Sequence, residues 1–277
     1  NPTYSGWSDT NSTPMGLIHR NPCGPGNGFE GWGTFNPTQN LVNRIQRYDG
    51  TPQPPYTDNT VDPWKDLEIR FSANIIADGA EWGYGSDRRV VETFISGETG
   101  VVPGLDSSQG QYWWNASNTG YALRKSCSPD FDSYGTTEWD APWIFIRLSE
   151  IYLNYAECQY HLGNDDVALE YVNKVRNRAL LPDATGDVWA AIEYERDVEL
   201  MFEGIRFLDM RRWKRMDEEY RTPVLGCEVK KFADGHKEYK LDVHIDQREW
   251  KGDKFYWVPV PRAELRKSSS LDALPYE

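Results

Sequence analysis

The residues IRLSEIYLNYAECQYHLGN (146–164), followed at once by DDVALEYVNKVRNRAL (165–180), decide the fold of this chain. In the first segment apolar residues recur at helical spacing, which predicts a helix with one apolar face. That face comprises Leu148, Ile151, Tyr152, Tyr155, Gln159 and Leu162. Gly163-Asn164 ends this helix. The second segment repeats the pattern over Val167, Ala168, Tyr171, Val172 and Val175. So short a connection predicts two antiparallel helices packed as a hairpin.

A longer helix is expected from about Val188 through Lys214, and it includes DVELMFEGIRFLDMRRWKR (197–215). Its apolar stripe is formed by Val198, Met201, Phe202, Ile205, Leu208 and Trp213. Charged residues interrupt this stripe, and an unpaired buried charge costs several kcal/mol. We therefore expect Glu203 to pair with Arg206 and Asp209 with Arg212, each three residues apart. Gly204 is expected to let a neighbouring element approach closely.

The chain divides by composition into three segments. Residues 1–140 are rich in Gly, Pro, Asn and Ser and predict a loop-rich, ligand-facing region. Within it we expect a short helix near 41–48, a strand near 69–75 and a strand with a turn within 110–126. Residues 141–216 are expected to form a helical scaffold and residues 217–277 a C-terminal extension packing on that scaffold, with all three segments in one structural unit. Ala156 and Ala168 lie where tetratricopeptide hairpins carry small residues. We expect a mainly α fold with long irregular loops, short strands and tetratricopeptide-like helical hairpins.

Composition excludes several classes of protein. The 277 residues carry a net charge of -13, which disfavours nucleic acid as a partner because phosphate backbones would be repelled. No apolar run approaches the length of a membrane span. Cys23, Cys127, Cys158 and Cys227 lie far apart without zinc-site spacing, and the sequence leaves their disulfide state open.

No catalytic residue, metal ligand or cofactor site is assigned from the sequence. The segment DFDSYGTTEWD (130–140) resembles a calcium loop around Gly135, but Tyr134 and Ala141 stand where ligands are needed, so a solvated acidic loop is expected. Glu199 and Glu203 could form a catalytic carboxylate pair, yet their basic neighbours already account for them. Since glycosidases need only two suitably separated carboxylates, a glycoside hydrolase remains an alternative.

Several groups of residues, in this order along the chain, together resemble the SusD/RagB family of outer-membrane glycan-binding lipoproteins. They are PTQNLV (37–42) with Asp49-Gly50, DPW (62–64) with Arg70-Phe71, RLSEIYLNYAEC (147–158) with NKVRNRA (173–179), ERDVELMFEGIRFLDMRRW (195–213), and VPVPRAEL (258–265) before LPY (274–276). The resemblance covers roughly residues 37–276.

The resemblance implies a cell-surface binding protein rather than an enzyme. Such proteins bind oligosaccharides or polysaccharides and pass them to a TonB-dependent, SusC-like transporter in the outer membrane, although some RagB-like relatives bind oligopeptides. Family members also begin with a signal peptide, a lipid-modified cysteine and several helices. The resemblance therefore implies that this chain is the C-terminal part of such a lipoprotein, and that the missing N-terminal helices are one of its partners. A helical module whose only ligand is the transporter remains a further alternative.

Aromatic residues are the candidates for binding a glycan. The chain has 12 Trp and 16 Tyr, and sugar rings need flat apolar surfaces bordered by polar groups. We expect some of the rings in the loop-rich segment to form a stacking platform: Trp32, Tyr56, Trp82, Tyr84, Trp113 and Trp114. In an extended strand Trp113 and Trp114 would point to opposite sides. For any one ring the alternative is that it anchors its loop in the core.

Overall fold

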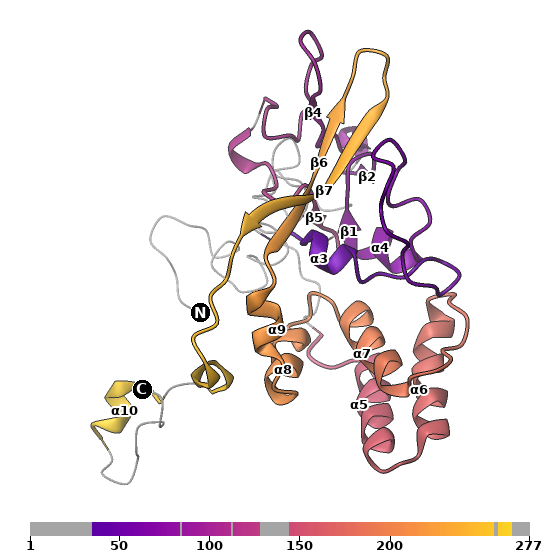
Figure 1. Cartoon of the computed structure of the whole chain (residues 1–277), viewed down its shortest axis with the longest axis vertical. Coiled ribbons are helices and arrows are strands. Elements are labelled where there is room, and N and C mark those ends of the chain that lie inside the picture. Colours follow the sequence, from indigo (N-terminus) through magenta and orange to yellow (C-terminus); the bar gives the residue numbers. More distant parts are fainter. Residues whose placement is uncertain (1–34, 84, 112, 128–143, 258–259, 268–277) are drawn as a thin grey trace.

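The computed structural model describes residues 35–83, 85–111, 113–127, 144–257 and 260–267. The longer helices gather at one end of the molecule, and loops with short strands occupy the other (Figure 1). This arrangement confirms the expected mainly helical class with long loops and short strands.

The helical end is built from consecutive elements: α5 (Leu148–His161), α6 (Asp165–Arg178), α7 (Val188–Glu199), α8 (Ile205–Arg212) and α9 (Met216–Arg221). The expected hairpin of α5 and α6 is confirmed. Its connection contains Gly163 at a φ of +80°, a conformation that favours glycine. Ala156 and Ala168 are both fully buried in the apolar cluster that joins α5, α6 and α7. Small side chains at these two positions let the helices approach closely.

The face that α5 buries is not the one expected. Leu153 and Ala156 pack against Val172 of α6 and Ile192 of α7. The residues expected to be buried lie largely on the outer side, where the exposed fractions are 60% for Leu148, 49% for Ile151, 41% for Tyr155 and 72% for Leu162. The prediction was wrong because α5 has apolar residues on two sides, and the side with the small Ala156 packs on the neighbouring helices. We call Leu148, Ile151, Tyr155 and Leu162 the α5 stripe.

The single long helix expected from Val188 to Lys214 is broken into α7 and α8. Between them Phe202 has a φ of +64° and Gly204 a φ of +80°, so the helical path is interrupted at residues 200–204. A Cβ built on Gly204 meets no atom within 4 Å. The glycine therefore serves the left-handed backbone rather than the close approach that we expected.

The loop-rich end carries short elements: α3 (Gln39–Val42), α4 (Ile69–Asn74), β1 (Ile75–Ile76), β2 (Glu81–Trp82), η1 (Gly85–Asp87), β3 (Arg89–Val90), β4 (Ile95–Ser96), η2 (Trp113–Asn115) and β5 (Ala122–Leu123). The Thr38 hydroxyl caps α3 by accepting from the Leu41 amide at 3.3 Å. The strand expected near 69–75 is mostly the helix α4, followed by two residues of β1 that pair with β5. Alternation at Ile69, Phe71 and Ile75 is too short a pattern to separate helix from strand.

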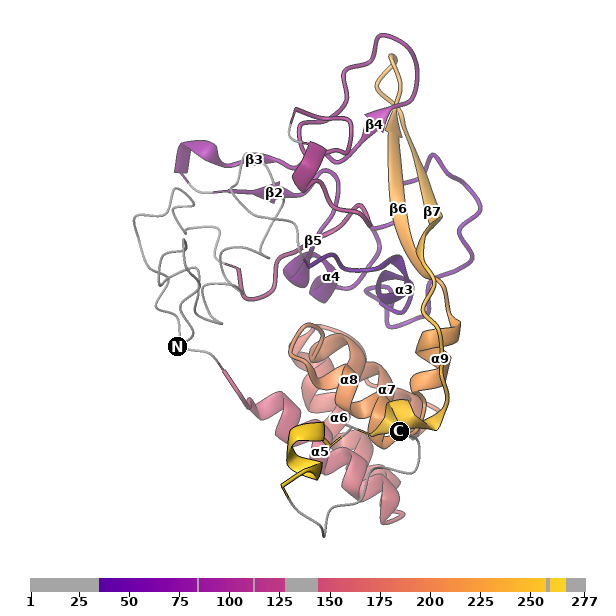
Figure 2. The ribbon, with the colours of Figure 1, turned by 90° about the vertical axis from the view of Figure 1, so that its left-hand side faces the viewer.

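A long hairpin crosses the loop-rich end. The strands β6 (Val224–Lys231) and β7 (Lys237–Asp246) pair antiparallel around a turn at Asp234-Gly235, and β4 pairs parallel with β6. Because β6 follows α9, it returns the chain from the helical end to the loops (Figures 1 and 2). Beyond it lie η3 (Asp253–Tyr256) and the short helix α10 (Arg262–Leu265). The division into three segments stays a prediction, although strands of the third are seen to pair with the first.

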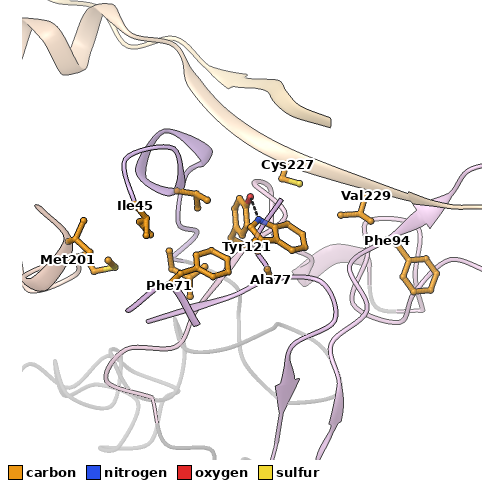
Figure 3. Packing of buried hydrophobic residues seen from close by; sticks show 12 residues of the cluster. Ile45, Phe71, Ala77, Phe94, Tyr121, Met201, Cys227 and Val229 are labelled. Atoms are coloured by element: carbon orange, nitrogen blue, oxygen red, sulfur yellow. Dashed lines mark hydrogen bonds between the residues drawn. The ribbon is translucent and has the colours of Figure 1, made fainter. Parts of the chain in front are cut away.

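One apolar cluster joins the two ends of the molecule. It combines Phe71 and Tyr121 of the loop-rich end with Met201 of the α7–α8 turn and Val229 of β6 (Figure 3). Tyr121 is fully buried, and its hydroxyl accepts a hydrogen bond from Trp64 Nε1 at 3.1 Å. A buried hydroxyl needs such a partner. The loops are therefore packed onto the helical end and onto the long hairpin rather than projecting from them.

Candidate functional site

Trp113 and Trp114 form an exposed pair of rings at the loop-rich end. They begin the 3₁₀ turn η2, not a strand, so they do not point to opposite sides as expected. Trp113 is 64% and Trp114 60% exposed, with ring centroids 6.2 Å apart and ring planes at 85°. Within this turn the two rings lie edge to face beside each other. Two large rings left in water at right angles offer a flat apolar contact to a ligand.

The other expected rings do not join this pair. Trp82 is only 7% exposed, packs with Ile76 and Val91, and has the Arg124 guanidinium 5.5 Å from its ring centroid. Its ring is therefore not available for stacking on a ligand. Trp82 instead anchors its loop in the core, which was the alternative expected for any one ring. Trp32 and Tyr84 lie outside the described residues.

The loop that carries Tyr56 and the turn that carries the tryptophan pair lie on opposite sides of the β6–β7 hairpin. In Figures 1 and 2 the loop of residues 53–67 and the turn at residues 113–115 flank the hairpin on different sides. Tyr56 is 38% exposed, and its hydroxyl donates to the Val61 carbonyl at 2.8 Å. Burial, with nearby acidic groups, raises the pKa of Tyr56 to about 12. The expected single platform is thus divided between two places.

The charged residues of the helical end serve as ion-pair partners for the loops. Arg70 of α4 holds Glu68 at 2.7 Å and Glu195 of α7 at 2.6 Å, all of them buried. The expected pair of Asp209 with Arg212 is confirmed at 2.8 Å. The other expected pair is not formed, because the partners come from distant elements: Glu203 binds Arg147 and Lys125, whereas Arg206 binds Glu219.

Glu199 and Glu203 are bound too tightly to act as a catalytic pair. Arg147 donates to Glu199 at 2.5 Å and to Glu203 at 2.8 Å. Burial alone would raise the pKa of Glu203, but hydrogen bonds from Arg147 and the charge of Lys125 outweigh it and lower the pKa. The pKa of Glu199 is lowered in the same way by Arg147, against burial. A general acid requires the reverse shift.

The described residues hold no cluster of metal ligands, no disulfide between two of them and no helix that could span a membrane. Within them, no group of three or more His, Cys, Asp or Glu side chains could hold a metal ion. No disulfide joins any two of the described cysteines, Cys127, Cys158 and Cys227, while Cys23 and the acidic segment 130–140 lie outside the described residues. None of the helices in the described part is both long and apolar enough to cross a membrane.

Sequence reasoning missed a groove beside Tyr56. Its walls are the loop of residues 53–67 and the strands β6 and β7, and its volume is about 960 Å³. The prolines of TPQPPYT (51–57) indicate a stiff loop, which forms one wall of this groove. Nothing local in the sequence, however, links that loop to strands that come so much later in the chain.

Comparison with known proteins gives a consistent result. The sequence model of the SusD family matches residues 3–276. A stretch of 94 residues is 37% identical to the SusD-like protein P25 of Formosa agariphila, covering 28% of this chain and 17% of that protein.

Solved structures agree. A SusD-like protein of Bacteroides fragilis superposes with a TM-score of 0.71 at 30% identity, over 88% of this chain and 47% of the other. A SusD-like carbohydrate binding protein of the same species gives a TM-score of 0.62 at 22% identity, over 85% and 48%. The chain thus spans about half the length of these structures.

Proposed function

Because this chain belongs to the SusD family, we propose that it binds oligosaccharides or polysaccharides at the cell surface and delivers them, without cleaving them, to a SusC-like TonB-dependent transporter. The carbohydrate binding named for the similar B. fragilis protein supports this ligand class. Placement at the outer membrane, through a lipid anchor, follows from the same resemblance and is part of the proposal.

The observation that carries the proposal is the exposed pair Trp113 and Trp114. Leaving two tryptophan rings mostly in water is costly for the protein alone, and such rings gather at binding surfaces. Their perpendicular planes, 6.2 Å apart at the centroids, allow a pyranose to lie on one face while the second ring contacts its edge. Neither ring carries a charge, so the contact suits the apolar C–H faces of sugars.

Binding without catalysis is supported by the state of the carboxylates. Glu199 and Glu203, at the junction between loops and helices, are bound to Arg147, and the pKa of each is lowered. Burial raises the pKa of Glu195 instead, but this side chain is fully buried between Arg70 and Arg176, where no substrate reaches it. Glycoside hydrolysis needs one carboxyl group that stays protonated to serve as acid.

Additional helices are a further part of the proposal. The α5 stripe leaves four large apolar side chains exposed along one helix face, and helices usually bury such a face against a partner. The matching solved structures are about twice as long as this chain. We propose that N-terminal helices, as the resemblance implies, cover the α5 stripe.

The test is a binding panel combined with an assay for cleavage. Native protein is run through gels containing amylopectin, dextran or galactomannan, and the same polymers are incubated with it and assayed for new reducing ends. Retarded migration without reducing-end release is expected. Reducing-end release that is abolished by changing one Asp or Glu would replace the proposal with a hydrolase.

Failure to bind any of these polymers, with binding to peptides instead, would shift the ligand class to oligopeptides. The delivery role is tested separately by co-expression with a SusC-like transporter. The two proteins are expected to co-purify, and absence of a complex would contradict that part alone.

A further inference from the structure

The groove between residues 53–67 and the β6–β7 hairpin is lined by both apolar and charged residues and is separate from the tryptophan pair. It has a volume of about 960 Å³, at the upper end of the roughly 300–1,000 Å³ typical of ligand pockets. It is therefore large enough for several linked rings rather than one small molecule.

The groove is already formed by contacts within the protein. The Tyr239 amide of β7 donates to the Asn59 carbonyl at 2.8 Å, which ties the loop to the strand. At the base of the loop, the Gln53 side-chain amide donates to the Val42 and Ile45 carbonyls, both at 2.7 Å. The buried Trp64 ring packs at 5.3 Å on the ring of Tyr239. A ligand would meet a rigid wall and would lose little affinity to ordering it.

Charges of both signs line the groove, and only some of them are paired with each other: Arg47 with Asp66 at 3.7 Å and Lys230 with Glu228 at 3.6 Å. The described structure gives the side chains of Lys65, Lys240, Glu238 and Asp242 no ion-pair or hydrogen-bond partner, although all of them line the groove. Arg47, also in the lining, has a buried Nε that lacks an acceptor within the described residues. A strongly charged ligand would be repelled by one half of this set. A neutral molecule rich in hydroxyl groups can accept from the cations and donate to the carboxylates.

Tyr56 supplies the flat apolar surface. Its ring is 38% exposed and lines the groove, while its hydroxyl is occupied by the Val61 carbonyl at 2.8 Å. The phenol is thereby fixed, so its ring face rather than its hydroxyl is what a ligand would contact. Pro54, Pro55 and Pro63 add further rigid apolar surface to the same lining.

We propose that this groove is a second binding site for the same neutral glycan, stacked on Tyr56 and hydrogen-bonded by the unpaired charged side chains. The inference rests on the proposed function and narrows it. Two separate contact sites on one protein favour a long, uncharged polysaccharide chain over a short oligosaccharide, because only a long chain gains from both.

The experiment measures retardation in gels containing amylopectin, dextran, galactomannan or polygalacturonate. The variants are Tyr56→Ala, Lys240→Ala and the matched control Tyr56→Phe, which keeps the ring but loses the bond to Val61. Tyr56→Ala is expected to weaken binding to a neutral polymer about fivefold, from the ring area available, with a smaller loss for Lys240→Ala. Tyr56→Phe should bind as the native protein does. The double variant Trp113→Ala, Trp114→Ala should keep weak binding that Tyr56→Ala then removes.

Other results would contradict either the groove as a binding site or the proposed function itself. If the native protein is retarded by a neutral polymer and both Tyr56→Ala and Lys240→Ala match it, the groove is not a site and the proposed function stands. If Tyr56→Phe loses as much as Tyr56→Ala, the residue only anchors its loop, which also overturns the inference. Stronger retardation by polygalacturonate than by any neutral polymer overturns the neutral class. Binding to none of the polymers removes the proposed function itself.

Discussion

Changing Trp113 and Trp114 to alanine removes the exposed ring pair with little expected effect on the fold. Both residues lie on a surface turn, where substitutions usually change the free energy of unfolding by less than about 0.5 kcal/mol. A loss of binding can then be assigned to the lost ligand contact rather than to unfolding, once the thermal midpoint of each variant is shown to match that of the native protein.

The size of the effect follows from the exposed area. A tryptophan side chain presents at most about 250 Å², and Trp113 is 64% exposed, which leaves roughly 160 Å² in water. A sugar ring covers one face of the indole, or about 80 Å², and at about 25 cal/mol per Å² this contributes about 2 kcal/mol. The dissociation constant of Trp113→Ala should therefore rise about 30-fold. Trp114, 60% exposed, should give a similar value.

The assay is isothermal calorimetry with the polymer that the gel panel identifies. Trp257→Ala is the matched control, because that tryptophan is 52% exposed but is remote from the pair in sequence. It should bind as tightly as the native protein. Because the Trp113 and Trp114 rings lie 6.2 Å apart and would share one ligand, the double variant need not show the sum of the two effects.

The reasoning is refuted if both single variants bind as tightly as the native protein. It is also refuted if Trp257→Ala loses as much affinity as they do, since exposed aromatic surface in general, and not this pair, would then be responsible.

Other predictions concern the stability of the fold: its buried ion pairs, the α5 stripe and the backbone at Gly204. Arg70→Met leaves the buried Glu68 without its cation and removes one of the two arginines that hold the buried Glu195. It should lower the free energy of unfolding by about 3–5 kcal/mol in urea titrations, whereas the exposed Arg88→Met should lower it by at most about 1 kcal/mol, and equal effects would contradict this prediction. Because the pKa of Glu203 is lowered, its stabilisation is complete above the ordinary value of 4.5 and is lost as the pH falls through the folded value, so Glu203→Gln should flatten the acid decline of the thermal midpoint; an unchanged decline counts against the pairing. Ile151→Asp should reduce binding of a hydrophobic dye without loss of stability, whereas a clear loss of stability would mean that the stripe is already covered. Gly204→Ala should cost about 1–2 kcal/mol in the same urea titrations, and no cost would show that its left-handed backbone is unimportant.

Much of the helical end could be predicted from the sequence because its signals are local. Helical spacing, Gly163 after the first helix and the small Ala156 and Ala168 were sufficient to predict the α5–α6 hairpin. The pairing of Asp209 with Arg212 was also predictable, since the two residues lie one turn apart on a helix.

The remainder depends on contacts between distant residues. Glu203 could not be assigned to Arg147 from spacing, because 56 residues separate them. The break before α8 was missed because Phe202 takes a left-handed backbone that its residue type does not favour. The buried side of α5 was misassigned because both of its sides carry apolar residues, and the position of α6 and α7 decides between them.

The same distinction explains the candidate sites. Aromatic composition was sufficient to select the rings, but not to say which of them are exposed: Trp82 is buried by the β2–β3 pair, while Trp113 and Trp114 are exposed by a tight turn. Such differences arise from loops, which have no periodic signal.

The buried ion pairs account for how loops can hold ready-made binding surfaces. Arg70 binds Glu68 through two hydrogen bonds, at 2.7 and 2.8 Å, and its guanidinium also reaches Glu195 on α7. Two-point arginine–carboxylate contacts fix orientation as well as distance, whereas apolar packing alone permits sliding. The charges on the inner helices therefore do more than offset one another. They fix the loop-rich end on the helical end, so that the tryptophan pair and the Tyr56 groove keep a constant spacing, which a long chain must match to contact both.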